Sequence, residues 1–503
     1  MTEISGDAAL ELIQTQIDAH SSGIVRALAP FEPTSAFFTW LDTWRAVEEF
    51  INLPTFAVED PSLENRIIEL RLDPVDLLAL AGIVRDLRST FSDGVADRFR
   101  LTVLQAGAIG SAFLQHGMFE PAAGLQSVAH AIGYFQSRRR HLAALLYSLP
   151  STCSGGSTMI RLDTLNQLMP QVEHSGMTLT GLYQKLMLAK VFPDFTLRID
   201  ANGFSANHEY EPLDSMYIEP ERAGILEVRR STSSVEDTAP LKPVDPRLIF
   251  SAAELRNDIR ILEATYAEFE LAQSPFGAAA RFAESCLADC EDDYQIKLSA
   301  SRFRELADAA ELPHAVRAQL VYKGGDYVAS TDAIAPFILM GDLRVGSVTL
   351  LSRFLYYYKT ACLNRNRRFQ IRSGFIFEDN VKDALKRQGF EVSDVKRIKQ
   401  KEFDVLALLE GVVYNIQCKN NLVDLSRIET DATRFARYNR RLDRYYANAL
   451  AKEEAREALL KERFGATDVR HFVVSRFPIA TANPKVIGFN RIATFRERMT
   501  NGY

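Results

Sequence analysis

The chain lacks long apolar runs, paired cysteines and clustered histidines, and each absence excludes a class of protein. No apolar stretch of roughly 18 or more uncharged residues is present, so the sequence predicts no membrane span. No basic start followed by an apolar segment marks a secretory signal, and the five scattered cysteines are typical of a reducing compartment. We therefore expect a cytoplasmic protein. The eight histidines form no HExxH or HxH motif, which excludes the common zinc hydrolase patterns.

Length and composition indicate several globular domains. The 503 residues exceed the roughly 100 to 200 that are typical of one domain, so we expect two or three domains. A hydrophobic share of 47% and a charged share of 25% are ordinary for a globular protein, and they exclude collagen-like, disordered and disulfide-stapled classes.

Charge is distributed unevenly along the chain. Residues 359–503 hold 29 Lys and Arg against 18 Asp and Glu, a balance of +11, whereas the preceding residues carry −17. Basic surfaces bind phosphate backbones mainly by counterion release, so the asymmetry predicts a polyanion-binding module joined to an acidic one. The acidic part would then bind a partner protein or a second copy of the chain. On charge alone, a solvated basic surface without a ligand is the alternative.

The apolar spacing divides the chain into three predicted domains. Residues 1–150 carry apolar side chains at intervals of three and four, which predicts a helical domain. Residues 151–345 form a mixed, mostly helical domain with a linker rich in Ser, Thr and Pro at 231–246. Residues 359–503 form the basic C-terminal domain. The sequence therefore predicts an α+β multidomain protein with a mainly α-helical N-terminal region.

The individual elements of the first two domains are predicted from periodicity. Helical spacing is clearest in five segments: 37–51, 75–87, 101–114, 142–149 and 251–290. Strand character marks three segments: 196–199, 224–228 and 322–330.

A helix is predicted near the start of the C-terminal domain. The segment 374–388 has an apolar stripe that includes Phe377 and Val381, and it stops at Gly389 as a helix with a glycine C-cap does. Glu378 lies at the border of this stripe, so its carboxylate should point along the seam between the helix and a sheet. An ordinary surface glutamate is the alternative interpretation.

A strand pair is predicted next. The runs 402–409 and 412–419 are short β-type segments separated by a Glu-Gly pair, which favours a hairpin. Because side chains alternate across a strand, Gln417 and Lys419 share one face, and we expect Asp404 to point to the same side from the neighbouring strand. Asp404 stands among leucines, where an isolated carboxylate is costly to bury, and a bound cation would remove that cost.

These residues resemble the PD-(D/E)XK nuclease superfamily. The shared pattern is a helical Glu after a Gly-x-x-[FY] opening, an Asp in an apolar strand and a [DEQ]-x-K tripeptide on the next strand, here GFIFE, EFDVLAL and IQCKN. The Gln-x-Lys form is similar to that of the Mrr-type restriction endonucleases. The resemblance covers residues 370–480 and implies a C-terminal α/β/α restriction-endonuclease-like domain with a central mixed sheet.

The resemblance also implies an activity, namely metal-dependent endonucleolytic hydrolysis of DNA in restriction or anti-phage defence. The implied catalytic residues are Glu378, Asp404, Gln417 and Lys419. Asp404 would be the principal ligand of Mg²⁺ or Mn²⁺, and Glu378, Gln417 and the backbone carbonyl of Cys418 would complete an oxygen-rich shell. Lys419 would act on the attacking water or on charge that develops at the phosphate. The alternative is a catalytically degenerate nuclease fold that serves as a nucleic-acid-binding or scaffold component.

A long helix predicted at 425–464 supplies the candidate DNA contacts. Four arginines recur at intervals of 3, 4 and 3 residues and so share one face: Arg434, Arg437, Arg441 and Arg444. Tyr438 and Tyr445 lie beside this stripe, which favours phosphate binding with nearby aromatic stacking. A solvated helix with charge pairs is the alternative, and it is favoured for 452–463, where both signs alternate. A further strand is predicted at 470–477.

Overall fold

The computed structural model describes residues 2–56, 60–118, 124–200, 203–210, 252–420, 431–476 and 478–500. The chain is an α+β protein in which helices predominate and mixed sheets lie in the C-terminal half, as the sequence predicts. The strand predicted at 224–228, the linker predicted at 231–246 and the start of the helix predicted at 425–464 lie outside the described residues. None of the described helices is long and apolar enough to cross a membrane.

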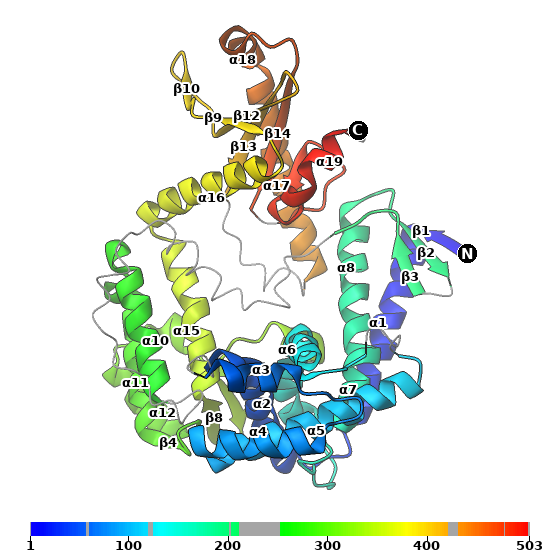
Figure 1. Ribbon diagram of the computed structural model, residues 1–503, viewed down its shortest axis with the longest axis vertical. Coiled ribbons are helices and arrows are strands. Elements are labelled where there is room, and N and C mark those ends of the chain that lie inside the picture. The colour runs from blue at the N-terminus through cyan, green and yellow to red at the C-terminus, as the bar shows by residue number, and fades with distance from the viewer. Residues whose placement is uncertain are drawn as a thin grey trace.

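Long helices build the N-terminal module, residues 2–210 (Figure 1). Its elements are β1 (Thr2–Ser5), α1 (Gly6–Leu28), α2 (Pro33–Phe56), α3 (Pro61–Glu69), α4 (Leu77–Thr90), α5 (Asp93–Gln115), α6 (Val128–Thr152), α7 (Thr164–Gln171), η2 (Val172–Gly176), α8 (Met177–Val191), β2 (Thr196–Asp200) and β3 (Gly203–Ala206). The four predicted helices and the strand at 196–199 are confirmed. One hydrophobic core spans this module from Ala9 to Tyr210 and continues into the middle module through residues such as Tyr327 and Ile338, so the domain boundary predicted at residue 150 lies inside α6 and inside this core.

Residues 252–363 form the middle module, which has a second hydrophobic core and a five-stranded sheet of order β4-β5-β8-β7-β6. Its elements are α10 (Ala252–Thr265), η4 (Ala267–Phe269), η5 (Leu271–Gln273), α11 (Pro275–Cys286), η6 (Leu287–Asp289), β4 (Cys290–Glu291), β5 (Gln295–Ser299), α12 (Ala300–Ala309), α13 (His314–Arg317), β6 (Val321–Tyr322), α14 (Tyr327–Thr331), β7 (Phe337–Met340), β8 (Leu343–Ser347) and α15 (Val348–Leu363). The strand predicted at 322–330 is wrong beyond Tyr322, because the Asp326 side chain caps α14 at the Ala329 N–H.

Residues 367–500 form the C-terminal module. Its elements are α16 (Arg367–Arg387), β9 (Glu391–Ser393), β10 (Arg397–Ile398), β11 (Lys401–Glu402), β12 (Val405–Leu409), β13 (Val412–Lys419), α17 (Ala432–Glu454), α18 (Glu457–Phe464), β14 (Val469–Ser475), β15 (Val486–Gly488), η7 (Phe489–Thr494) and α19 (Phe495–Thr500). The predicted hairpin, the strand at 470–477 and the helix before the hairpin are confirmed, whereas the long helix is broken between α17 and α18. α16 begins earlier than predicted because the Asn366 side chain caps the N–H groups of Arg368 and Phe369.

A mixed five-stranded sheet of order β15-β14-β13-β12-β9 forms the centre of this module, with helices on both faces. β12 and β13 are antiparallel, whereas β13 and β14 run parallel. On one face, Tyr414 and Ile416 pack under α16 and α19, and on the other, Val413 packs under α18 and Val473 under α17. The C-terminal module is therefore an α/β/α sandwich.

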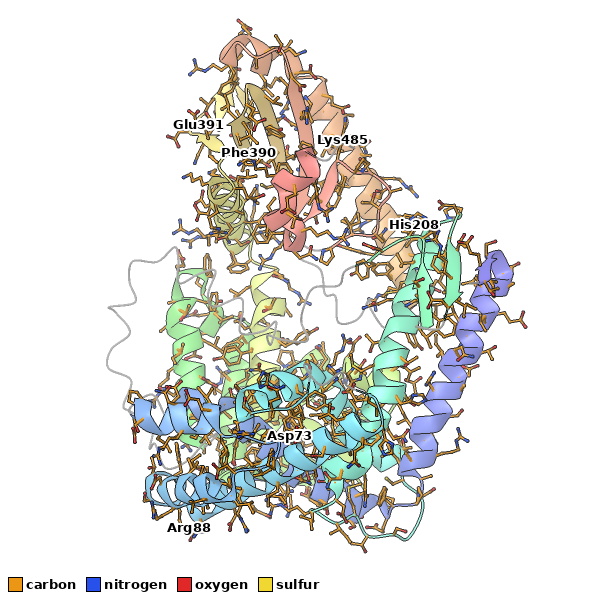
Figure 2. The ribbon with its side chains drawn as sticks, turned by 45° about the vertical axis from the view of Figure 1, so that its right-hand side comes forward. Asp73, Arg88, His208, Phe390, Glu391 and Lys485 are labelled. Atoms are coloured by element: carbon orange, nitrogen blue, oxygen red, sulfur yellow. The ribbon has the colours of Figure 1, made fainter. Side chains whose placement is uncertain are left out.

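Two helices attach the C-terminal module to the rest of the chain (Figure 1). At one side, Phe369 of α16 packs into the core of the middle module, 5.2 Å between ring centroids from Phe269. At the other, the first half of α17 packs against α8, and the Phe435 ring lies 5.0 Å from Tyr210. Figure 2 places His208 beside this second contact.

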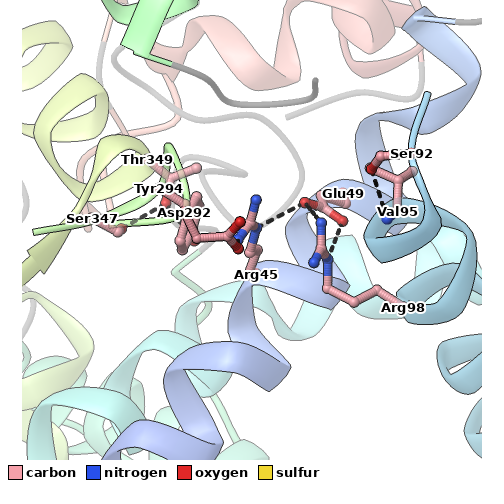
Figure 3. Close-up of polar contacts among 9 residues, drawn as sticks. All are labelled: Arg45, Glu49, Ser92, Val95, Arg98, Asp292, Tyr294, Ser347 and Thr349. Carbon is pink, nitrogen blue, oxygen red and sulfur yellow. Dashed lines mark hydrogen bonds and ion pairs between the residues drawn. The ribbon is translucent and has the colours of Figure 1, made fainter. Parts of the chain in front are cut away.

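A network of ion pairs lies within the N-terminal module and reaches the middle module through Arg45–Asp292 and Arg140–Asp332 (Figure 3). The Glu49 carboxylate accepts hydrogen bonds from Arg45 at 3.0 Å and from Arg98 at 2.6 and 2.7 Å. Arg45 also donates to Asp292 of the middle module at 2.6 Å, and its guanidinium lies 4.4 Å above the Tyr294 ring. Three consecutive arginines of α6 likewise pair with acids of three different segments: Arg138 with Glu173, Arg139 with Glu48 and Arg140 with Asp332. Most of this network is not predictable from the sequence, because all of these pairs except Arg45 with Glu49 join segments that are distant along the chain.

Candidate active site

The hairpin that carries the candidate residues closes as the Glu-Gly pair predicts. Glu410 and Gly411 have φ angles of 52° and 80°, the left-handed values that a tight hairpin turn requires. The register pairs Val405 with Ile416, and its continuation by one residue places Asp404 opposite Gln417. Side chains of directly opposed residues lie on the same face, so the predicted convergence of these two residues is observed.

Asp404 is held at the end of the sheet by two donors from β13. The Gln417 side-chain amide and the Cys418 backbone N–H, the latter at 2.8 Å, both donate to the same Asp404 oxygen, Oδ2. Burial raises the pKa of the Asp404 carboxyl, and the Cys418 N–H and the charge of Lys419 partly offset that rise. This carboxylate is therefore fixed in direction and sits in a half-buried site close to a cation.

Glu378 approaches the same site from α16. The helix buries Phe377 and Val381 under the sheet, which leaves Glu378 half-buried at the edge of the apolar stripe. Burial and the neighbouring charge of Asp404 raise the pKa of Glu378 to about 7. Within the described residues Glu378 has no hydrogen-bond or ion-pair partner. Glu378 is therefore a partly desolvated carboxylate within electrostatic range of a second one, and not an ordinary surface glutamate.

Lys419 lies on the same face of β13 as Gln417 and points toward α17. Its Nζ lies 5.6 Å from the centroid of the Tyr445 ring, and its charge acts on both Asp404 and Cys418. Burial, followed by the charges of Asp404 and Glu378, raises the pKa of the Cys418 thiol well above its usual range. Cys418 therefore contributes backbone groups here and not a thiolate ligand.

The four candidate arginines of α17 continue from Tyr445 along the outer face of the helix. All are exposed, and the described residues offer them no carboxylate partner: Arg434, Arg437, Arg441 and Arg444. The Arg441 guanidinium lies 5.6 Å from the Tyr438 ring centroid, and Arg441 is one turn before Tyr445. Tyr445 thus lies between Lys419 on β13 and the arginine face of α17.

Three residues that the sequence analysis did not single out support the site. Asn420, directly after Lys419, donates to the Ser373 hydroxyl of α16 at 2.8 Å and accepts from Arg476 at 3.0 Å. These bonds tie α16, which carries Glu378, to the ends of β13 and β14. Asn420 stands in the quoted IQCKN string, so its position was available from the sequence, whereas Ser373 and Arg476 become recognisable only once the elements are packed.

A polar layer lies behind the site under α17. The buried Asn415 side chain, on the same face as Gln417, contacts Glu453 at 3.2 Å and His471 at 3.1 Å. Glu453 is in turn paired with Arg456 at 2.9 Å. This layer makes the face of β13 polar from Asn415 to Lys419, next to the apolar contact of Val413 with α18.

The site offers oxygen donors of two carboxylates, one amide and one backbone carbonyl. In the part of the chain that the structure describes, no group of three or more His, Cys, Asp and Glu side chains is arranged to hold a metal ion. The site has only two side chains of these four types, Glu378 and Asp404, and its third candidate ligand is the amide of Gln417. Any cation here would thus depend on amide and backbone oxygens in addition to two carboxylates.

Comparison of the chain with protein-family models, with curated proteins and with solved structures gives no match. The resemblance of the motif to the PD-(D/E)XK nucleases therefore depends on its residues and their geometry alone.

Proposed function

We propose that the C-terminal module is a metal-dependent endonuclease that hydrolyses DNA phosphodiester bonds. The observation that carries the proposal is the convergence of four predicted residues from three elements at one end of the sheet: Glu378 of α16, Asp404 before β12, and Gln417 and Lys419 of β13. The mixed sheet between helices is also the architecture that the resemblance implies for a restriction-endonuclease-like domain.

The donor set fits a hard divalent cation such as Mg²⁺ or Mn²⁺. Two half-buried carboxylates stand close enough for the charge of Asp404 to raise the pKa of Glu378, an arrangement that a nearby dication stabilises. Asp404 and Glu378, with the amide oxygen of Gln417 and the backbone carbonyl of Cys418, would hold the ion. When bound, such an ion supplies Lewis-acid polarisation of the scissile phosphate and a more acidic water.

The remaining roles belong to groups of the chain itself. Gln417 and the Cys418 N–H fix the direction of the Asp404 carboxylate, which lowers the cost of reorganisation during the reaction. The Lys419 ammonium group stabilises negative charge that develops on the phosphate oxygens. The arginine face of α17 binds the backbone beyond the scissile bond and sets its register.

A nuclease fold that binds nucleic acid without cutting it is the second candidate. It is favoured by the presence of Gln417 where a third carboxylate would strengthen metal binding. It is disfavoured by the desolvated Glu378, because a residue without function in a degenerate site gains nothing from burial beside another carboxylate.

The test is cleavage of plasmid and linear DNA by the full chain with Mg²⁺ or Mn²⁺. We expect metal-dependent cutting that is lost in Asp404→Ala and in Lys419→Ala. The matched controls are Asp468→Ala and Lys461→Ala, which remove exposed charges of the same module that pair with Arg470 and Glu457. DNA binding without cutting by the wild-type protein would favour the second candidate, and equal cutting by Asp404→Ala would place the centre elsewhere.

A further inference from the structure

Within the described residues, the exposed aromatic side chains lie on the two helices that flank the candidate active site. The chain contains 31 Phe, 17 Tyr and 2 Trp, yet among the described residues only Phe375 and Tyr445 are exposed, at 53% and 49%. Both rings belong to the C-terminal module, and neither belongs to one of the clusters of its core. Large apolar rings left in water at a charged site are typical of surfaces that bind an unsaturated or aromatic ligand.

Phe375 stands on the Glu378 side of the site. It precedes Glu378 by three residues on α16, so the two side chains are neighbours on one helix face. Ile371, one turn earlier on the same face, is also 52% exposed. The buried stripe of α16, which includes Phe377 and Val381, lies on the other side of the helix. Phe375 is therefore exposed because the helix turns its side chain away from the sheet.

Tyr445 stands on the Lys419 side. Its ring centroid lies 5.6 Å from the Lys419 Nζ, and Arg441 is one turn before it on α17. Tyr446, the next residue, is buried and donates or accepts a hydrogen bond with Ser475 at 2.8 Å, which fixes this part of the helix against the sheet. The exposed ring is thus presented by a rigid element directly beside cationic groups.

We propose that the site takes single-stranded DNA, with unpaired bases stacked on Phe375 and Tyr445 at the two sides of the centre. This inference rests on the proposed function and specifies its substrate. Bases in an intact duplex are stacked on one another and present no ring face, whereas single strands are bound by aromatic platforms combined with a basic groove. The arginines of α17 and Lys419 supply the charge that the backbone of such a strand requires.

A protein partner fits this surface less well than single-stranded DNA does. Protein-binding surfaces have a contiguous apolar centre with few charges, whereas here each exposed ring is adjacent to Lys419, Arg441 or Glu378. A duplex would be held by the arginines alone, and the two rings would then remain in water without a function.

The experiment compares binding of labelled 20-nucleotide single strands, the matching duplex and an RNA strand of the same sequence, in EDTA so that nothing is cut. Strands that carry 2-aminopurine report stacking through fluorescence quenching. The variants are Phe375→Ala, Tyr445→Ala and the conservative Tyr445→Phe. The control is Leu78→Ala, which removes another exposed apolar side chain, 86% exposed in the N-terminal module. Thermal unfolding verifies that each variant is folded.

We expect the wild type to bind the DNA single strand about tenfold or more tightly than the duplex, and each alanine variant to lose about tenfold in single-strand affinity together with the quenching. Tyr445→Phe and Leu78→Ala should bind as the wild type does. Equal binding of the duplex, tighter binding of RNA, or alanine variants that bind and quench as the wild type would overturn the inference.

Failure of the proposed function has a different signature. If single-strand binding and quenching behave as expected but no DNA is cut with Mg²⁺ or Mn²⁺, the stacking inference stands and the nuclease does not. If duplex DNA is cut and the alanine variants cut it normally, the nuclease stands and the stacking inference does not.

Discussion

The two ends of the molecule treat buried charge in opposite ways. In the N-terminal module, Arg45, Glu49 and Arg98 are buried as complementary partners, with direct hydrogen bonds that satisfy each charge. In the C-terminal module, Glu378 and Asp404 bring two like charges together at the end of a sheet. Complementary pairs fix a structure, whereas like charges held together are costly and persist where another charge is to be bound. The comparison predicts that substitutions at the first site change stability and those at the second change activity.

The largest effect is expected for Asp404→Asn. The substitution keeps the shape of the side chain and removes its charge, so we expect cleavage to fall by about 10³-fold or more. The free energy of unfolding should change by less than about 1 kcal/mol, because the lost carboxylate was partly desolvated. Steady-state cleavage and urea unfolding measure the two quantities. A large loss of stability with retained cleavage would remove the contrast between the modules.

The reverse result is expected for Glu49→Gln. This change leaves the Arg45 and Arg98 charges buried without their common partner, which should lower the free energy of unfolding by about 3 to 5 kcal/mol. DNA cleavage at temperatures below the transition should be retained. Glu11→Gln, at an exposed position of α1, is the control and should unfold as the wild type does. Urea unfolding of the two variants gives the comparison, and equal stability would contradict the structural role of the network.

Acid sensitivity should also originate in the N-terminal module. His141 contacts Tyr327 at 2.8 Å, and burial together with the charges of Arg140 and Arg138 lowers the pKa of His141 to about 3. Unfolding returns the pKa to about 6.5, so the unfolded chain binds the proton first and stability is lost as pH falls from about 6.5 toward 3. At pH 5 this group alone should cost about 2 kcal/mol.

The measurement is the difference in urea unfolding between pH 7.5 and pH 5. His141→Gln should be less stable at pH 7.5, since it disturbs the contact with Tyr327, yet it should lose less stability on acidification. His116→Gln, at an exposed position, should keep the wild-type dependence. Identical pH dependence of wild type and His141→Gln would show that other groups cause the acid loss.

The smallest effect is expected on the basic face of α17. Replacing Arg441 and Arg444 together by Ala should weaken DNA binding by about tenfold and reduce the slope of log affinity against log salt concentration by about 1 to 2. The unfolding free energy should stay within about 0.5 kcal/mol, because both side chains are exposed. Lys452→Ala with Arg463→Ala removes the same charge from the same module and should leave the slope unchanged.

Much of the candidate site could be predicted because it depends on local rules. Strand alternation places Gln417 and Lys419 on one face, and the Glu-Gly turn sets the register that brings Asp404 to them. The helical period places Glu378 at the edge of the α16 stripe. The sequence alone does not show which apolar positions of a helix remain exposed to solvent after the elements pack. The exposure of Phe375 was therefore not predicted, because in the string GFIFE this residue resembles an ordinary core residue.

The missed parts of the fold depend on contacts between distant segments. β1 pairs with β2 although their partners Glu3 and Arg198 are far apart in sequence, and the pattern of residues 2–5 alone is too short to predict a strand. The boundary predicted at residue 150 followed a change in composition, whereas the cores are set by packing. The arginine triplet at 138–140 has the composition of an exposed basic patch, and only the acids of other elements explain its place within the fold.

The double attachment of the C-terminal module has a mechanical consequence. A module with a single contact to the rest of a protein is free to rotate about that contact. The C-terminal module has two contacts, because Phe369 of α16 packs into one core and Phe435 of α17 packs into another. α17 is a single helix of 23 residues, about 35 Å long. Its first half packs against α8, and its second half carries Tyr445 and packs against the central sheet. A displacement of α8 would therefore be carried by this one helix to Tyr445, so the position of the ring beside Lys419 depends on packing outside the candidate site.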